Sequence, residues 1–424
     1  MSELLKRTDR LWSGQASTAQ AEFHPFAGPR MLEELAPGVA FFKAFVNVTA
    51  VKTGEGLVLV DTGAYLPASH KLSFEAVRGW NRERLHTAVY THGHVDHAYG
   101  LPPFLAEART RGWQAPRIVG HENVLPRMQR YVRTAGYNSI INTRQFAVET
   151  HWPVEFQAPT DTYADHLELS IGGARFQLHH AKGETDDHTW VFLPETKTLC
   201  TGDLFIWAAP NAGNPQKVQR YAVEWAAALR TMAALHPELL LPGHGLPIAG
   251  AARVQAALLD TAEYLESLVT QTLARLNAGQ TLYEILEEVR PPAALEAKPY
   301  LRPVYDEPEF IVRNLWRCFG GWHSGVPSEL KPAPRAAQAK ELALLAGGVE
   351  RLLERSRALL AAGDARLAAH LVDWAAEAAP ASREVHAARA AVYKALMDGA
   401  SSTMSRGIYG AAARESAAKA NPGG

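Results

Sequence analysis

Short apolar or β-branched runs alternate with turn residues and amphipathic stretches between about residues 34 and 250. Most runs are bounded by Gly, Pro or Asp, as strands usually are. The pattern predicts strands at 39–45, 57–61, 87–91, 117–119, 174–179, 190–193, 198–200 and 239–241. Helical spacing between them predicts helices near 102–111, 123–134 and 223–235. Strands that alternate with helices favour a layered α/β domain.

The pattern changes after Gly250, where stretches rich in Ala, Leu, Glu and Arg replace the strand signals. Helical spacing predicts a helix over 251–276 and helical hairpins over 349–396. So few hairpins cannot bury their own apolar faces, so we expect them to dock on something else. We interpret the Pro-rich segment 290–308 as a connection and expect the stretch after Met397 to fray. The expected division is an extension (1–33), an α/β domain (34–280), a helical domain (281–400) and a tail (401–424).

Composition narrows the class of protein. The 424 residues favour two domains, and 43 basic against 44 acidic residues give a net charge of −1, which argues against a nucleic-acid-binding protein. No apolar run approaches the ~18 residues that span a bilayer, so we expect no membrane segment. Two cysteines exclude a disulfide framework, and the first twenty residues lack the apolar stretch of a secretory signal. We therefore expect a cytoplasmic protein.

The clearest chemical signal is the segment Thr91-His92-Gly93-His94-Val95-Asp96-His97, which follows a predicted strand. His92 and His94 are two residues apart, so on an extended segment they point to one side and can share a metal. Asp96 and His97 come after the chain turns, so they can face a second metal. Imidazole and carboxylate are ligands that zinc prefers. A His-rich loop without a metal is the alternative, but such a cluster is costly near a core unless a cation organises it.

Three distant residues complete the set. His188 precedes the strand predicted at 190–193, whereas Asp203 and His244 follow the ends of the strands at 198–200 and 239–241. Open α/β sheets bind ligands at the carboxyl ends of their strands. Each residue alone is a weak signal, because a lone His or Asp in a turn is commonly a cap. Together with the cluster they form a specific set of five His and two Asp.

The H-x-H-x-D-H motif with these distant His, Asp and His residues resembles the metallo-β-lactamase superfamily, over about residues 34–250. The resemblance implies a four-layered αββα sandwich with a two-metal site at one edge. It implies two Zn²⁺ ions per chain, with iron or manganese left open. It assigns His92, His94 and His188 to the first metal, Asp96, His97 and His244 to the second, and Asp203 as the bridge. It also implies that Asp61 supports the site without binding metal.

Residues 290–400 resemble the dimerisation domain of the metallo-β-lactamase-type alkylsulfatases, in Pro299-Tyr300-Leu301-Arg302-Pro303, Glu307-Pro308-Glu309, Gly321-Trp322 and Leu345-Ala346-Gly347-Gly348. The resemblance implies a homodimer formed through an all-α helical-hairpin domain. Two departures stand out: those enzymes carry Glu where His188 and Asp203 align, and we expect no sterol-carrier-like domain of the kind that follows in the full-length enzymes. The second departure puts specificity for long alkyl chains in doubt.

Such a site predicts a hydrolase of sulfate or related esters, because two cations lower the pKa of a bridging water toward ~7. Asp96 and Asp203 are the catalytic carboxylates that would orient the hydroxide. An anionic substrate needs further hydrogen-bond donors, and the candidates are Asn142, Arg144, Lys217 and Arg220. The alternative for each of them is a surface residue with no role in binding. His121 and His323 are candidates for the general acid, although a structural role is the commoner one for a histidine.

Other functions remain open at this point. The same two-metal site could act on a thioester, a lactone or a phosphodiester. Some superfamily members bind iron and act as oxygenases, and a non-catalytic dimeric scaffold is a further alternative. No ligand of the motif is missing, which disfavours the scaffold. The leading hypothesis is a zinc hydrolase that acts on a small ester.

Overall fold

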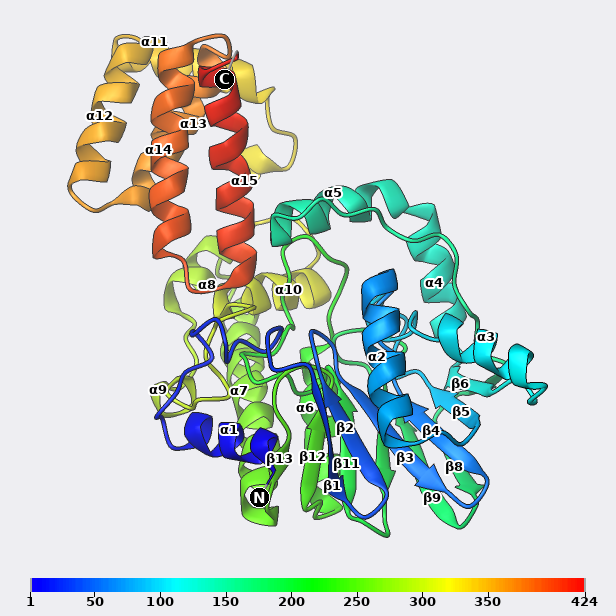
Figure 1. Cartoon of the computed structure of the whole chain (residues 1–424). Helices are drawn as coiled ribbons and strands as arrows, with labels where there is room; N and C mark the ends of the chain where they lie inside the picture. Colours follow the sequence, from blue (N-terminus) through cyan, green and yellow to red (C-terminus); the bar gives the residue numbers. More distant parts are fainter. Residues whose placement is uncertain (1, 423–424) are drawn as a thin grey trace. The chain divides into compact units, whose positions relative to one another are not determined.

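The computed structural model describes residues 2–422, which form two compact units (Figure 1). Unit 1 contains the chain up to Ala135 together with Trp152–Gly321. Unit 2 contains Gly136–His151 and the chain from Trp322 onward. No helix within residues 2–422 is long and apolar enough to cross a membrane.

Two β-sheets form the centre of unit 1. The first sheet has seven strands in sequence order: β1 Met31–Ala36, β2 Val39–Lys43, β3 Val48–Thr53, β4 Gly56–Val60, β5 Leu85–Val89, β6 Arg117–His121 and β7 Asp161–Tyr163. The second has six, in the order β13 Ile248–Ala249, β12 Leu239–Pro242, β11 Thr198–Gly202, β10 Thr189–Leu193, β9 Ala174–His180 and β8 His166–Ile171. Strands β4 to β7 run parallel, and so do β11 and β12.

Helices cover the outer faces of both sheets (Figure 1). The helices of unit 1 are α1 Glu3–Trp12, α2 Pro67–Trp80, α3 Pro102–Arg111, α4 Val124–Arg133, α6 Ala222–Ala234, α7 Ala251–Asn277, α8 Leu282–Glu288, α9 Ala293–Glu296 and α10 Pro308–Gly320. The side chains of α2, α3 and α4 pack on the first sheet, and those of α6 and α7 pack on the second.

The alternation of side chains along β4 produces the layers. Val58 and Val60 point into the core between the two sheets, whereas Leu57 and Leu59 join the separate core beneath α2 to α4. A strand with both faces buried reads as a continuous apolar run, which explains the sequence Leu57-Val58-Leu59-Val60. The predicted αββα sandwich is therefore confirmed.

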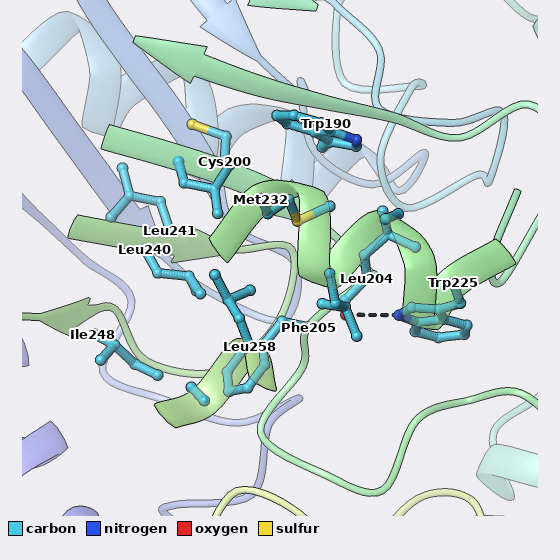
Figure 2. Close-up of a cluster of buried hydrophobic side chains, with 14 of the residues drawn as sticks. Trp190, Cys200, Leu204, Phe205, Trp225, Met232, Leu240, Leu241, Ile248 and Leu258 are labelled. Carbon is cyan, nitrogen blue, oxygen red and sulfur yellow. Dashed lines mark hydrogen bonds between the residues drawn. The ribbon is translucent and has the colours of Figure 1, made fainter. Parts of the chain in front are cut away.

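Figure 2 shows how α6 packs on the second sheet. Met232 of α6 and Leu240 of β12 belong to the same core, and both are fully buried. The indole N–H of Trp225 donates a hydrogen bond of 2.8 Å to the carbonyl oxygen of Leu204. Because Leu204 directly follows Asp203, this bond anchors the segment that leaves β11.

Unit 2 is helical. Its elements are α5 Ala135–Phe146 (from Gly136 onward), the short helix η1 Pro327–Glu329, α11 Arg335–Ala346, α12 Val349–Ala361, α13 Ala365–Ala378, α14 Arg383–Gly399 and α15 Thr403–Ala420. Leu353, Val372 and Val392 belong to its buried core. A methyl group at Gly407 of α15 would lie 2.1 Å from the carbonyl oxygen of Gln145, so α5 packs closely against α15.

The structure divides the chain differently from the expected boundaries. Residues 281–321 fold with unit 1, and 136–151 fold with the C-terminal helices. The segment 290–308 is not a loose connection, because Tyr300 and Leu301 are buried in the main core of unit 1. The expected extension is also part of this core through Leu4 and Leu11. The stretch expected to fray contains α15, an ordered helix of 18 residues.

Candidate metal centre

The carboxyl ends of four strands carry the candidate site. Asp61 follows β4, the segment 91–97 follows β5, Asp203 follows β11 and His244 comes two residues after β12. Each sheet contributes one parallel pair, β4 with β5 and β11 with β12, and both pairs end at the same edge of the sandwich. The amide of Asn47 joins the two sheets there, because its Nδ2 donates to the carbonyl oxygens of Pro242 and Gly245 at 2.8 and 3.0 Å.

The first group of ligand atoms belongs to His92, His94, Glu184 and Asp203, and these atoms all lie within 4.8 Å of one another. His92 Nε2 and His94 Nδ1 are 2.7 Å apart. Glu184 Oε2 lies 3.8 Å from each of these nitrogens. This oxygen is buried and has no hydrogen-bond partner among the described residues, so it is available to a cation.

The second group contains Asp96, His97 and His244. His97 Nε2 and His244 Nε2 are 3.3 Å apart, and Asp96 Oδ2 lies 3.7 and 3.4 Å from them. Asp203 reaches this group as well, with Oδ1 3.3 Å from His97 Nε2 and Oδ2 3.6 Å from His244 Nε2. One carboxylate therefore contacts both groups.

Neighbouring residues orient the rings of the second group. His97 Nδ1 lies 2.7 Å from Asp61 Oδ2, and His244 Nδ1 lies 2.6 Å from the carbonyl oxygen of Phe45. A carbonyl oxygen can only accept, so His244 Nδ1 donates to it and the opposite nitrogen, Nε2, faces the group. Such partners commonly fix the tautomer and orientation of metal-binding histidines. Asp61 belongs to neither group, and it also accepts hydrogen bonds from the backbone N–H and the hydroxyl of Thr91 at 2.8 and 2.9 Å.

The electrostatics of the first group fit a bound cation. Burial lowers the pKa of His92 and of His94 well below the usual range, so both rings are neutral, which is the form that binds metals. Burial also raises the pKa of Glu184, and the charge of Asp203 adds to this effect. Two carboxylates buried side by side are costly unless a cation lies between them. The donor set of imidazole and carboxylate suits zinc and related divalent metals.

His188 lies beside the first group, and its assignment as a ligand of the first metal stays a prediction. Its Nε2 accepts a hydrogen bond of 3.1 Å from the backbone N–H of Asp203, and its ring stacks on His92 with centroids 4.8 Å apart. Glu184, which stands four residues earlier in the same loop, belongs to the first group and is a candidate ligand. The loop contributes a further contact through Asp187, whose Oδ2 accepts from the backbone N–H of Gly93 at 2.8 Å.

Glu184 is the residue that the sequence reasoning missed. The alkylsulfatase resemblance implies a Glu near this position, and the segment Gly183-Glu184-Thr185 offers one, so the signal was present. Arg220 Nη1 lies 3.3 Å from Glu184 Oε1 and also donates to the carbonyl oxygen of Glu184. The amide of Asn211 donates to the same Oε1. Arg220, a candidate for substrate binding, therefore contacts a ligand residue.

Lys217, another substrate-binding candidate, lies in unit 1 with Nζ 5.4 Å from the centre of the Trp152 ring. Burial and the charge of Arg220 lower the pKa of Lys217 to about 8, although Glu184 and Asp96 oppose the shift. A cation here can attract an anionic substrate.

The remaining candidates lie elsewhere. His121 ends β6, where its ring stacks on His180 with centroids 3.7 Å apart and its Nδ1 accepts from the backbone N–H of Asn123. It belongs to neither ligand group. Asn142, Arg144 and His323 belong to unit 2. Asn142 is buried in α5, where its Nδ2 donates to the carbonyl oxygen of Asn138 at 2.8 Å. These three assignments stay predictions.

Two sequence families match the chain. Residues 43–244 match the Metallo-beta-lactamase superfamily, and residues 281–419 match the family described as Alkyl sulfatase dimerisation. The chain is 29% identical over 350 residues to a linear primary-alkylsulfatase of Pseudomonas sp. (strain ATCC 19151), which covers 77% of this chain and 64% of the relative. It is 25% identical over 394 residues to an (R)-specific secondary-alkylsulfatase of Pseudomonas sp., which covers 87% and 59%.

A solved structure is similar over most of the chain. The stereoselective inverting sec-alkylsulfatase Pisa1 from Pseudomonas sp. superposes with a TM-score of 0.81 at 22% identity, over 92% of this chain and 66% of that one. This similarity confirms the fold. The chain spans 59 to 64% of the length of the two curated relatives named above. With both family matches and the ligand groups in place, residues 43–244 are a metallo-beta-lactamase region, residues 281–419 are an alkylsulfatase-type dimerisation region, and the chain is similar to the alkylsulfatases over both.

Proposed function

We propose that this chain is a metal-dependent hydrolase of sulfate esters that uses two zinc ions. The observation that carries the proposal is the meeting of two ligand groups from three strand ends and one loop, with Asp203 in contact with both. The similarity to alkylsulfatases supports the substrate class, because it extends over the catalytic and the dimerisation regions.

In this proposal His92, His94 and Glu184 hold the first zinc ion. Asp96, His97 and His244 hold the second, and Asp203 binds both. Bound zinc ions would lower the pKa of a coordinated water to near neutrality and act as Lewis acids toward the ester.

The carboxylates of the chain would orient the attacking water by accepting its hydrogen bonds. Asp96 is the most accessible of the ligand side chains, at 24%, against 9% for Asp203 and 15% for His94. Substrate is therefore expected to approach from the side of Asp96. The proposed binding groups for the sulfate are Lys217 and the part of the Arg220 guanidinium that is not engaged by Glu184. Two cations compensate an anion that enters a buried acidic site.

A thioester is the second candidate substrate. The chain is 25% identical over 222 residues to an atrochrysone carboxyl ACP thioesterase of Cryptosporiopsis sp., and that match covers 52% of this chain. The alkylsulfatase match covers 77% and is closer in identity, which favours the sulfate ester. The lactone, phosphodiester and iron-oxygenase alternatives stay predictions, and the assays described next test them.

The test uses the full chain stripped of metal by a chelator and then reloaded with zinc. We expect zinc-dependent release of sulfate from alkyl or aryl sulfates, and slower turnover of phosphodiesters, thioesters and lactones. His94→Ala should abolish the activity, whereas His166→Ala, at an exposed position on β8, should keep it. Full activity in the metal-free protein or in His94→Ala would contradict the proposal. Oxygen consumption with bound iron would favour the oxygenase.

We also propose a homodimer formed through the helical domain. Residues 281–419 match the dimerisation family, and Leu344 and Leu345 at the end of α11 are 74 and 83% exposed in the single chain. Adjacent exposed leucines commonly mark an interface. Light scattering should give twice the mass of one chain, and a monomer at micromolar concentration would contradict the dimer.

A further inference from the structure

The contacts around Glu184 extend away from the metal centre to α10. The first of them are made by the segment 211–220, which lies between β11 and α6. Asn211 donates to Glu184 Oε1, and Arg220 Nη1 contacts both the side chain and the backbone carbonyl of Glu184. All three residues are almost fully buried. Oε1 is thus engaged by two donors, while Oε2 faces His92 and His94.

Helix α10 holds this segment from the other side. Asn314 Oδ1 accepts from the backbone N–H of Arg220 at 3.3 Å, and Asn314 Nδ2 donates to the backbone carbonyl of Arg220 at 2.9 Å. This reciprocal pair fixes the backbone of Arg220 as a strand partner would. The first turn of α10 also contacts Gly213, since a methyl group there would lie 2.1 Å from the backbone nitrogen of Ile311.

Asp306, just before α10, completes the connection. Its Oδ2 accepts from the backbone N–H of Gly213 at 2.7 Å, and its Oδ1 accepts from the backbone N–H of Glu307 at 2.7 Å. Asp306 is fully buried. One end of the segment 211–220 is therefore fixed by Asp306 and the other end by Asn314.

We propose that Arg220 is a positioning residue for the first metal, and that Asn314 of α10 holds Arg220 for this task. The inference rests on the proposed metal centre but not on the identity of the substrate. A carboxylate with a free choice of rotamers would turn Oε1 or Oε2 toward the metal or away from it. The two donors on Oε1 leave Oε2 as the ligand atom. They also offset part of the free energy needed to bury the charge of the Glu184 carboxylate.

The positioning role differs from sulfate binding in what it predicts. If Arg220 only bound sulfate, its loss would weaken substrate binding and leave the metals in place. If it positions Glu184, its loss weakens the first metal even when no substrate is present. Asn314 gives the sharper variant, because its side chain contacts the backbone of Arg220 and neither ligand group.

The experiment measures Co²⁺ binding to the metal-free full chain by absorption spectroscopy with a competing chelator. His94→Ala and His97→Ala identify the signals of the first and second ions. We expect Arg220→Gln and Asn314→Ala to weaken the first ion about 10- to 100-fold and to leave the second unchanged, as is typical when a partner of a ligand is lost. Arg230→Gln is the matched control, because Arg230 forms a bidentate pair with Glu266 at the surface.

Wild-type affinity for both ions in Arg220→Gln and Asn314→Ala would overturn the inference and leave Arg220 as an anion-binding residue only. Far-ultraviolet circular dichroism checks folding, and if Arg220→Gln does not fold, Asn314→Ala and Asn211→Ala carry the test. A wild-type chain that binds no Co²⁺ would refute the proposed function and this inference together. A wild-type chain that binds two ions but hydrolyses no sulfate ester would refute the substrate class alone.

Discussion

A single methyl group added at Gly243 should disrupt the candidate metal centre. Gly243 lies between β12 and His244 and faces Asp203. A Cβ atom at this position would lie 2.3 Å from Asp203 Oδ1 and 2.9 Å from His97 Cε1. Its φ angle is not among the positive ones, so alanine is allowed by the backbone and the conflict is purely steric.

The size of the effect follows from these distances. Ordinary van der Waals contact begins near 3.4 Å, so the carboxylate of Asp203 must move by about 1 Å in Gly243→Ala. The same Cβ would also lie 2.9 Å from His97 Cε1 and from the backbone carbonyl carbon of Gly202, so three groups crowd it at once. A shift of ~1 Å in an active site costs about 100-fold in rate, or ~2.7 kcal/mol of transition-state stabilisation. Because Asp203 contacts both groups, we expect both metals to bind more weakly as well.

The assay compares kcat/KM for sulfate-ester hydrolysis and the number of bound zinc ions after dialysis. Gly79→Ala is the matched control, since a Cβ at this position on α2 meets nothing within 4 Å. It should keep wild-type activity and change the free energy of unfolding by no more than about 1 kcal/mol. Two bound zinc ions and wild-type kcat/KM in a folded Gly243→Ala variant would refute the steric argument.

Three further outcomes follow from the structure. Asp61→Asn should weaken the second metal selectively, since Asp61 fixes the ring of His97, and an unchanged affinity in metal titration would contradict this role. His188→Gln should keep two metals whereas Glu184→Gln should lose the first, and the reverse result by metal analysis would restore His188 as the ligand. Burial lowers the pKa of Lys43 from 10.5 to about 7, so the unfolded chain binds more protons between these values and stability should rise with pH there, by at most about 1.4 kcal/mol per unit. Lys43→Met should reduce this slope in denaturant unfolding at pH 7.5 and 9.5, and identical slopes would contradict the shift.

The strands and helices that could be predicted are those that a local sequence pattern determines. All eight expected strands are present, because buried parallel strands are continuous apolar runs such as that of β4. The helices α3 and α7 and the hairpins of unit 2 follow from their apolar spacing. Strands β1, β3, β7, β8 and β13 escaped prediction. In β8, for example, exposed and buried residues alternate over a segment that begins with His166 and has only one buried face.

The division into units depends on contacts that no local pattern shows. Helix α5 is encoded within the α/β region but packs on α15, where Gly407 allows the close approach. The first residues form α1, whose Thr8 hydroxyl donates to the carbonyl oxygen of Pro247 at 2.6 Å. Both pairings join segments far apart in the chain, so spacing and composition could not reveal them.

The residues of the candidate site that local patterns mark could also be predicted. The segment 92–97 is local, and Asp203 and His244 follow recognisable strand ends. The choice between Glu184 and His188 was not local, because both belong to one loop and either could face the metals. Arg220 and Asn211, far along the chain, direct the carboxylate of Glu184 into the first group, whereas the backbone of Asp203 occupies Nε2 of His188.

Sulfate release measured during a zinc titration of the metal-free chain tests the central claim most directly. We predict no hydrolysis without zinc and a rise in turnover that levels off at two ions per chain. A metal-free chain that turns over an alkyl or aryl sulfate at the full rate would contradict the account, and so would a zinc-loaded chain with a single ion and unchanged turnover.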